Sequence, residues 1–394
     1  MASSDVRLSA AMRAALAQDA RLALPHCGHG EPTAMQARYE AEHRWWNEGG
    51  PDIAWRADTL PTRHGAVAVR VYSPGQATWP AECGALSPVK LGTTAQFPAG
   101  ATRPIIVYLH GGSYCVGSPA THDRLIRELA AATDAAVVSV DYTLAPKARY
   151  PRISEECEDV VIELARRYPE CPIVLAGDSC GATLSLGTWW RLARRAGQDG
   201  AGERTERADT VGTETSRTAA RRLAAERIAA LVLYYGEYGV PVTVSASAET
   251  VSPDSTSAAD GMSPADRAYY DSLYFSSPTE RATALDTALL RTELHGSPPV
   301  FLAVGDCDPL VADTQALAAH LETSGVRVRL EVIPGVMHAF LQRVRLLPEA
   351  DRVIADTAAF LAEVLDRSGS TFDFGAPGHS SDSGASGGRI LSDR

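Results

Sequence analysis

The chain has 394 residues, 45% of them hydrophobic and 22% charged, with a formal net charge of −11 at pH 7. These proportions are typical of a globular protein, and the negative charge argues against nucleic acid or an anionic membrane surface as a partner. The sequence has no run of about 18 uncharged apolar residues, so we expect no membrane span. Residues 1–24 carry interspersed charges and lack the apolar core of a secretory signal, which favours a cytoplasmic location.

The seven cysteines are an odd number and include no C-x-x-C pair. This pattern favours reduced thiols over a disulfide framework or a zinc site. The sequence shows no metal signature that competes with the motifs described below, and the chemistry of those motifs requires no metal or other cofactor. Cys115, Cys180 and Cys307 lie close to the motifs described below. The sequence leaves open whether they fill apolar space or react with thiol reagents.

Residues 1–60 follow a helical pattern, and the alternation of Val67, Val69 and Val71 predicts an early strand. Residues 76–101 form a long connection with little periodicity. Apolar strands recur later in the chain, separated by helical stretches, at residues 105–109, 135–141, 173–176, 230–235, 300–304 and 326–333. This alternation predicts the α/β class, with a mostly parallel central sheet flanked by helices on both faces.

Two polar segments differ from the rest of the chain. Residues 197–222 contain almost no large apolar residue, which predicts a flexible surface insertion. Residues 369–394 are rich in Ser and Gly and predict a disordered tail. Between these segments, residues 236–294 hold a group of aromatics that either pack against the core or line a binding pocket: Tyr269, Tyr270, Tyr274 and Phe275.

The pentapeptide Gly177-Asp178-Ser179-Cys180-Gly181 lies between an apolar run and a helix-like run. Strand, G-x-S-x-G and helix in this order are typical of a nucleophile elbow, a sharp turn that exposes the serine hydroxyl. Such a turn needs small residues two positions before and after the serine, and both are glycine here. We therefore predict Ser179 as a nucleophile, and an ordinary strand-to-helix turn is the alternative.

A glycine-rich loop follows the strand at residues 105–109. In hydrolases of this type such a loop supplies backbone N–H donors to the developing oxyanion, together with the N–H that follows the serine. The loop lacks the spacing of a phosphate-binding sequence. We therefore expect an oxyanion hole formed by this loop and the Cys180 N–H, and the family resemblance described below implies Gly111, Gly112, Ser113 and Cys180 as its residues.

A carboxylate and a histidine complete the constellation. Asp306 and Asp308 both follow the apolar strand at residues 300–304, and either one is placed to orient an imidazole. His338 follows the last strand, so the chain order is Ser, Asp, His, as in an α/β-hydrolase.

Together these motifs resemble the hormone-sensitive-lipase-like carboxylesterases, a family with the α/β-hydrolase fold. The likeness runs from about residue 32 to about residue 366. It rests on matches to H-G-G-G at 110–113, D-Y-R-L-A-P-E at 141–147, G-D-S-A-G at 177–181, D-P-L at 308–310 and H-G-F at 338–340.

The resemblance implies Ser179 as nucleophile, His338 as general base and acid, and Asp308 as the orienting carboxylate. It also implies a helical cap made of residues 1–60 and 236–294. The cap covers a core made of residues 61–235 and 295–368.

Several residues depart from the family pattern. Ser113 replaces a glycine, which keeps the N–H donor and adds a side chain that narrows the acyl pocket. Cys180 replaces an alanine, Thr143 and Lys147 replace an arginine and a glutamate, and Ala339 replaces a glycine. None of these changes removes a catalytic group.

The sequence thus predicts a serine carboxylesterase that hydrolyses small, short-acyl esters through an acyl-enzyme, with a small-molecule ester as its partner. Two alternatives stay open. One is an amide, carbamate or lactone hydrolase with the same triad. The other is a ligand receptor on the same scaffold, against which the complete set of Ser, Asp and His argues.

Overall fold

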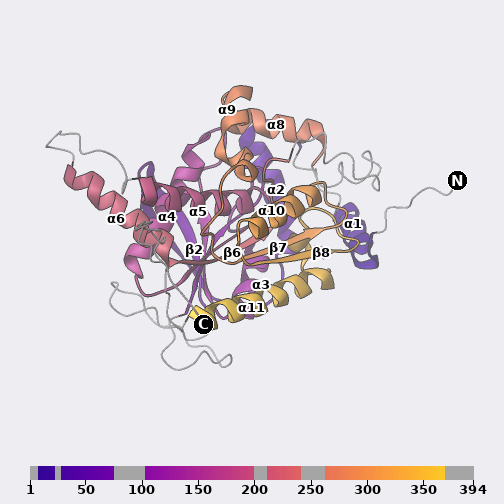
Figure 1. The fold of residues 1–394 in the computed structure, drawn as a ribbon. Coiled ribbons are helices and arrows are strands. Elements are labelled where there is room, and N and C mark those ends of the chain that lie inside the picture. Colours follow the sequence, from indigo (N-terminus) through magenta and orange to yellow (C-terminus); the bar gives the residue numbers. More distant parts are fainter. Residues whose placement is uncertain (1–7, 23–27, 75–102, 199–210, 241–261, 369–394) are drawn as a thin grey trace, which may run out of the picture.

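The computed structural model of the chain describes residues 8–22, 28–74, 103–198, 211–240 and 262–368 (Figure 1). The expected connection at 76–101 and the expected tail at 369–394 lie outside these residues. In the part of the chain that is described, no helix is long and apolar enough to cross a membrane.

One sheet of eight strands organises the described chain, in the order β1-β2-β4-β3-β5-β6-β7-β8. Strands β3 to β8 pair in parallel, whereas β2 pairs antiparallel with both β1 and β4. The predicted α/β class with a mostly parallel sheet is therefore confirmed. The strands are β1 Trp55–Thr62, β2 Gly65–Tyr72, β3 Ile105–Leu109, β4 Ala136–Asp141, β5 Ile173–Asp178, β6 Ile228–Tyr234, β7 Val300–Gly305 and β8 Val328–Ile333.

Helices cover both faces of this sheet. On one face lie α4 Arg152–Arg167, α5 Cys180–Gln198, α6 Val211–Arg227 and α10 Val311–Thr323, and on the other lie α3 Asp123–Thr133 and α11 Pro348–Ser368 (Figure 1). Every residue of β3, β5 and β7 is buried, because side chains on both faces of a parallel sheet meet helices. Alternate residues of β3 accordingly belong to the two separate hydrophobic clusters.

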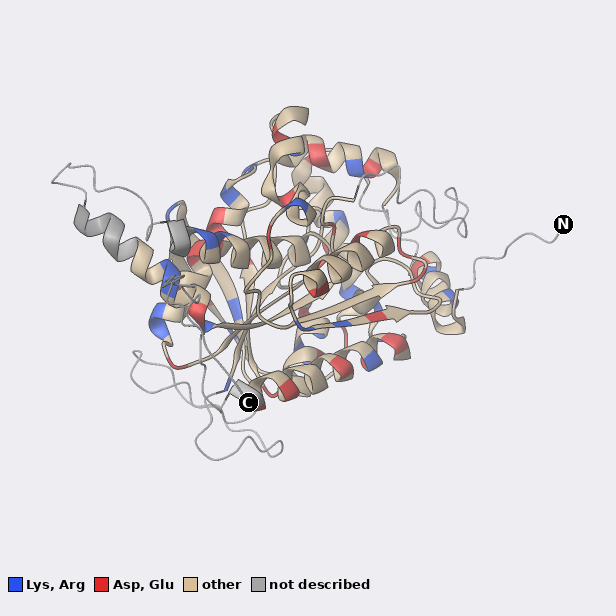
Figure 2. Cartoon of the chain, in the orientation of Figure 1, with Lys and Arg blue, Asp and Glu red and all other residues tan. Residues whose placement is uncertain are grey.

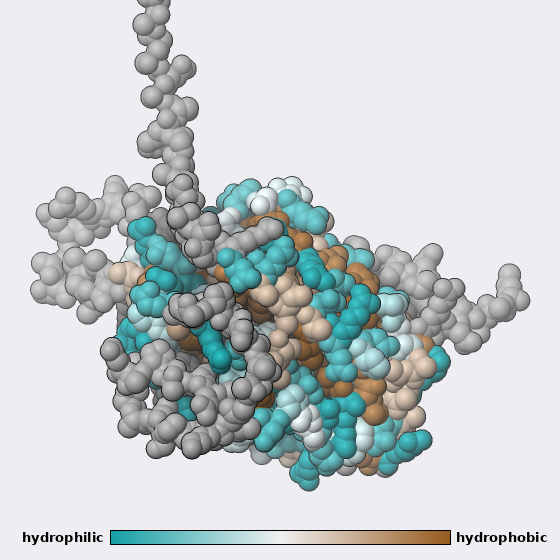
Figure 3. Space-filling model, turned by 90° about the horizontal axis from the view of Figure 1, so that it is seen from below, coloured by the Kyte–Doolittle hydropathy of each residue, from teal (hydrophilic) through white to brown (hydrophobic). Residues whose placement is uncertain are grey.

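The outer surface is mixed in charge and polarity. Acidic and basic residues are interspersed on the helices of both faces (Figure 2). Seen from the side of α11 and α3, hydrophilic residues surround scattered hydrophobic ones (Figure 3). This mixture is normal for a protein surface, since much of it is contributed by apolar atoms.

The two predicted cap segments contribute α1 Ala10–Leu22 and α2 Pro32–Trp46, and α8 Pro264–Tyr274 and α9 Pro278–Thr283. Helices α8 and α9 begin in the same way: a serine accepts a hydrogen bond from the third backbone N–H after it, and proline stands at the first helical position. The His29 ring stacks on Tyr269 with centroids 4.1 Å apart, which joins the start of α2 to α8.

Two expectations from the sequence are corrected by these elements. Residues 1–60 are not helical to their end, because β1 begins at Trp55 and forms a hairpin with β2. Residues 199–210 of the insertion expected at 197–222 lie outside the described residues, and from Val211 on this segment is not irregular but forms the helix α6. Its Ala224 is fully buried, and Arg221 pairs with the buried Glu158 of α4 at 3.2 Å.

A buried ion pair links the segment after α9 to α4, α5 and α8. Asp286 accepts hydrogen bonds from Arg191 of α5 at 2.8 Å, from Ser154 of α4 at 2.9 Å and from Tyr274 of α8 at 2.7 Å. Asp286 is 1% exposed and Arg191 6% exposed. Removal of one partner of such a pair leaves the other charge buried without compensation.

We expect Asp286→Ala to lower the free energy of unfolding by about 3–5 kcal/mol, because it leaves the buried Arg191 guanidinium without a carboxylate partner. Urea unfolding followed by circular dichroism measures the change. Arg194→Ala removes the half-exposed ion pair with Glu293 and serves as control, with an expected change within about 1 kcal/mol. Equal effects of the two substitutions would contradict this role of Asp286.

Candidate active site

A tight turn between β5 and α5 exposes Ser179 in a left-handed conformation, with φ of 53°. Its backbone N–H donates to Tyr234 O at 2.9 Å. A Cβ at Gly177 would lie 2.5 Å from the carbonyl of Gly181, and a Cβ at Gly181 would lie 1.9 Å from Leu109 O. Both glycines are therefore required by the close approach of the turn to itself and to the end of β3.

His338 lies between Ser179 and Asp308. Its Nε2 is 3.0 Å from Ser179 Oγ, and its Nδ1 is 2.8 Å from Asp308 Oδ2. Asp308 also accepts a hydrogen bond from the Leu310 N–H at 2.7 Å, which fixes the carboxylate. Both His338 and Asp308 are almost fully buried. With Nδ1–H donated to Asp308, the lone pair of Nε2 faces the serine hydroxyl.

The other acid, Asp306, has a different place in the structure. Its carboxylate accepts the Gly335 N–H at 2.6 Å, and its own N–H donates to Ile333 O at 2.9 Å. Asp306 thus fixes the start of the loop that carries His338. The sequence motifs left open whether Asp306 or Asp308 orients the imidazole. In the structure it is Asp308 that lies within hydrogen-bond distance of His338.

The three groups meet at one edge of the sheet, because they follow the carboxyl ends of β5, β7 and β8. Parallel strands present these ends together, and ligands of such sheets bind there. The residue after His338 is Ala339, with φ of 57°. This left-handed conformation explains why the resembled family has glycine at that position.

The loop after β3 also has unusual backbone angles. Gly112, Ser113 and Tyr114 have φ of 119°, 50° and 65°, and a Cβ at Gly112 would lie 2.1 Å from Val116 O. The Gly111 N–H donates to a carboxylate oxygen of Asp178 at 2.9 Å. This bond corrects the expectation that Gly111 belongs to the oxyanion donors, because its N–H is already used.

Asp178 is a buried anchor for that loop. Besides the Gly111 N–H, it accepts the Tyr108 hydroxyl at 2.8 Å and the Gln342 amide at 3.2 Å. His122 Nε2 lies 3.4 Å from the same carboxylate. Although burial alone would raise the pKa of Asp178, His122 and these hydrogen bonds hold it well below its usual range. The carboxylate therefore stays charged and keeps the loop in place.

The thiol of Cys180 packs under the same loop, where the Tyr114 N–H donates to Sγ at 3.2 Å. Burial raises the pKa of Cys180 to about 12, and burial likewise raises that of Cys307 to about 12. Since the thiolate is the reactive form, these values favour space-filling over reaction with thiol reagents at neutral pH.

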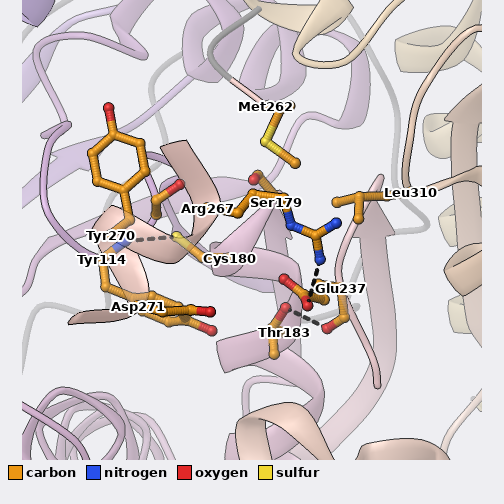
Figure 4. Close-up of a pocket in the computed structure, with 11 residues that line it drawn as sticks. Tyr114, Ser179, Cys180, Thr183, Glu237, Met262, Arg267, Tyr270, Asp271 and Leu310 are labelled. Atoms are coloured by element: carbon orange, nitrogen blue, oxygen red, sulfur yellow. Dashed lines mark hydrogen bonds and ion pairs between the residues drawn. The ribbon is translucent and has the colours of Figure 1, made fainter. Parts of the chain in front are cut away.

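A cavity of about 40 Å³ opens beside Ser179 (Figure 4). Its walls come from the loop after β3, from Ser179 and the start of α5, from the segment after β6, from α8 with Met262 before it, and from Leu310. The sequence left open whether the aromatics of residues 236–294 pack against the core or line a pocket. Tyr270 lines the cavity, whereas Tyr274 is fully buried and stacks on Tyr114 with ring centroids 3.8 Å apart. Helix α8, part of the predicted cap, therefore contacts both the cavity and the loop after β3.

Several residues of the site were not found from the sequence. Glu237 follows the carboxyl end of β6 by three residues, a position that could have pointed to it. Arg267 of α8 and His122 carry no such signal, because only folding brings them beside Glu237 and Asp178.

Burial also determines the charge of His110 at the start of the loop. Its Nδ1 is 2.7 Å from Gly111 O, and its Nε2 is buried without a hydrogen-bond partner among the described residues. Burial, together with repulsion from His122, lowers the pKa of His110 to about 3. The imidazole is therefore neutral in the folded protein.

Because the unfolded chain takes up this proton near pH 6.5 and the folded chain near pH 3, His110 lowers stability as the pH falls between these values. From pH 7 to pH 5 the loss is roughly 2 kcal/mol. We expect His110→Asn, which keeps a donor for Gly111 O, to reduce the loss of unfolding free energy between pH 7 and pH 5 by that amount in urea titrations. An unchanged loss would show that His110 is charged when folded.

Comparison with known proteins agrees with this geometry. A family model described as alpha/beta hydrolase fold matches residues 106–342, more than half of the chain. An esterase of the hyperthermophilic archaeon Pyrobaculum calidifontis is 23% identical, with a TM-score of 0.70, over 90% of this chain and 98% of that one.

A thermostable carboxylesterase cloned from a metagenomic library is 22% identical, with a TM-score of 0.64, over 85% of this chain and 98% of that one. An esterase of the fungus Rhizomucor miehei is 19% identical, with a TM-score of 0.68, over 91% of this chain and 98% of that one. At these identities the likeness shows the fold. With the family match and the motifs, it follows that the chain belongs to the α/β-hydrolase family, in its hormone-sensitive-lipase-like branch.

Proposed function

We propose that the protein is a serine carboxylesterase that hydrolyses small esters. The observation that carries the proposal is the position of His338, in hydrogen-bond reach of Ser179 on one side and of Asp308 on the other. A base held in one tautomer by a carboxylate is what a serine needs to become nucleophilic at neutral pH. The esterases among the similar structures support the same reaction class.

In the proposed acylation, His338 Nε2 takes the proton of Ser179 Oγ as that oxygen attacks the ester carbonyl. Asp308 stabilises the imidazolium that forms. The tetrahedral oxyanion receives hydrogen bonds from the backbone N–H groups of Gly112, Ser113 and Cys180. Each such donor typically lowers the barrier by about 2.7–4 kcal/mol. His338 then protonates the leaving alcohol, which departs and leaves the acyl-enzyme.

In the proposed deacylation, a water molecule replaces the alcohol. His338 takes one of its protons while the water oxygen attacks the acyl carbon, and the same N–H groups hold the second oxyanion. Collapse of this intermediate returns the proton from His338 to Ser179 Oγ and releases the carboxylic acid. All proton transfers thus pass through one imidazole.

The size of the cavity supports small substituents. About 40 Å³ of space beside Ser179 holds only a few water-sized groups, since one water needs roughly 10–15 Å³ on this measure. The Ser113 side chain, which replaces a family glycine, contributes to the wall. Among the described residues, these walls favour a small substituent on the ester, which supports the expected preference for short acyl chains if the acyl half lies in this cavity.

We expect wild-type protein to hydrolyse p-nitrophenyl acetate and butyrate, and Ser179→Ala to lose this activity because it lacks the attacking oxygen. Asp308→Asn should lower kcat about 10⁴-fold, since it leaves the imidazole in the wrong tautomer. The measurement is release of p-nitrophenol along an acyl series from acetate to palmitate.

Asp306→Asn is the matched control, because the Asn side-chain oxygen still accepts the Gly335 N–H and the bond between Asp308 and His338 stays in place. It should keep kcat within about tenfold of wild type. Inactive Asp306→Asn beside near-normal Asp308→Asn would refute the assignment of the acid. A folded wild type that hydrolyses no ester of the series would refute ester hydrolysis and point to an amide or lactone.

A further inference from the structure

The cavity beside Ser179 is more polar than a pocket for alkyl chains needs to be. Ligand pockets are mostly lined by hydrophobic and aromatic side chains, with a few polar groups that set orientation. Here Glu237, Arg267 and Asp271 all line the cavity that Ser179 and Leu310 share (Figure 4). Charged groups thus lie where the substituent of a bound ester would lie.

These charges form a connected group. Arg267 donates to Glu237 at 2.7 Å, and Arg281 lies 3.4 Å from the same carboxylate oxygen. Arg281 also pairs with Asp271. Two cations and two anions cancel, so the group is neutral as a whole. A charged group of the substrate that entered the cavity would therefore meet no unpaired side chain of opposite charge. The free energy cost of removing that group from water would not be compensated.

The Arg267–Glu237 pair can form further hydrogen bonds on the side of the cavity. A guanidinium has five N–H donors, and one of the two Nη groups of Arg267 donates to Glu237. The Arg267 and Glu237 side chains are 16% and 29% exposed, so both are partly withdrawn from solvent and still reachable. Donor and acceptor therefore stand side by side at the cavity.

An alkyl group against this pair would remove water from it and return no hydrogen bond, which is unfavourable. A hydroxyl or an amide both donates and accepts, so it satisfies Arg267 and Glu237 at once. We propose that the cavity binds an uncharged hydroxyl- or amide-bearing substituent of the ester, and that Arg267 and Glu237 determine this specificity. This inference rests on the proposed ester hydrolysis.

The test compares substrates that differ by one hydroxyl in place of one methyl. For the acyl half these are the p-nitrophenyl esters of 3-hydroxybutyrate and 3-methylbutyrate. For the alcohol half they are 2-hydroxyethyl acetate and propyl acetate, followed by acid release. Each kcat/KM is divided by the rate constant for hydrolysis by hydroxide, so that intrinsic reactivity cancels.

We expect wild type to favour the hydroxyl member of one pair by about tenfold or more, the worth of a hydrogen bond to a charged group. Arg267→Met removes the donors of the pair and Glu237→Met removes its acceptor, and each should bring that ratio to within about threefold of one. Arg194→Met, which removes an arginine from the exposed pair with Glu293, should leave the ratio unchanged. Circular dichroism checks that each variant is folded.

Activity on all four esters without preference for a hydroxyl in either pair would overturn the inference and leave the proposed function standing. A preference that survives both Arg267→Met and Glu237→Met would overturn the assignment to these residues. Inactivity of the folded wild type toward every ester would refute the proposed function and the inference with it.

Discussion

The site depends on one close approach, that of the turn after β5 to the end of β3. The turn places Ser179 in a left-handed conformation, and the carbonyl of Leu109 lies where a side chain at Gly181 would be. Hydrolysis by a serine needs the hydroxyl exposed and the following N–H beside it. The same contact brings the loop after β3 alongside the serine, so nucleophile and proposed oxyanion donors are positioned together.

Buried polar groups fix the loop after β3 next to Ser179. The charged Asp178 fixes the oxyanion loop through the Gly111 N–H, at a place where an uncompensated carboxylate would be costly. From the other side, Tyr274 of the cap stacks on Tyr114 and bonds to Asp286. The loop thus lies between Asp178 on one side and α8 on the other, so the packing of α8 and the geometry of the proposed oxyanion hole are linked.

Local motifs predicted most of the core. The G-x-S-x-G motif predicted the nucleophile elbow, because only glycine fits the close contacts of that turn. Apolar runs predicted the strands that are buried on both faces. The prediction failed for features that depend on contacts between residues far apart in the sequence or that leave no apolar pattern. β1 is an edge strand with a mostly exposed face, so it carries no apolar run. The Gly111 N–H is engaged because folding brings Asp178 to it, and the Arg267–Glu237 pair joins the cap to a loop of the core.

The central claim, that the elbow makes Ser179 the nucleophile through His338, is tested most directly by covalent labelling. A fluorophosphonate reacts with an activated serine and with little else. Peptide mass mapping of the labelled wild type should find one adduct, on Ser179, and His338→Ala should label far more slowly although folded. An adduct on another serine, or equal labelling rates in both proteins, would contradict the account.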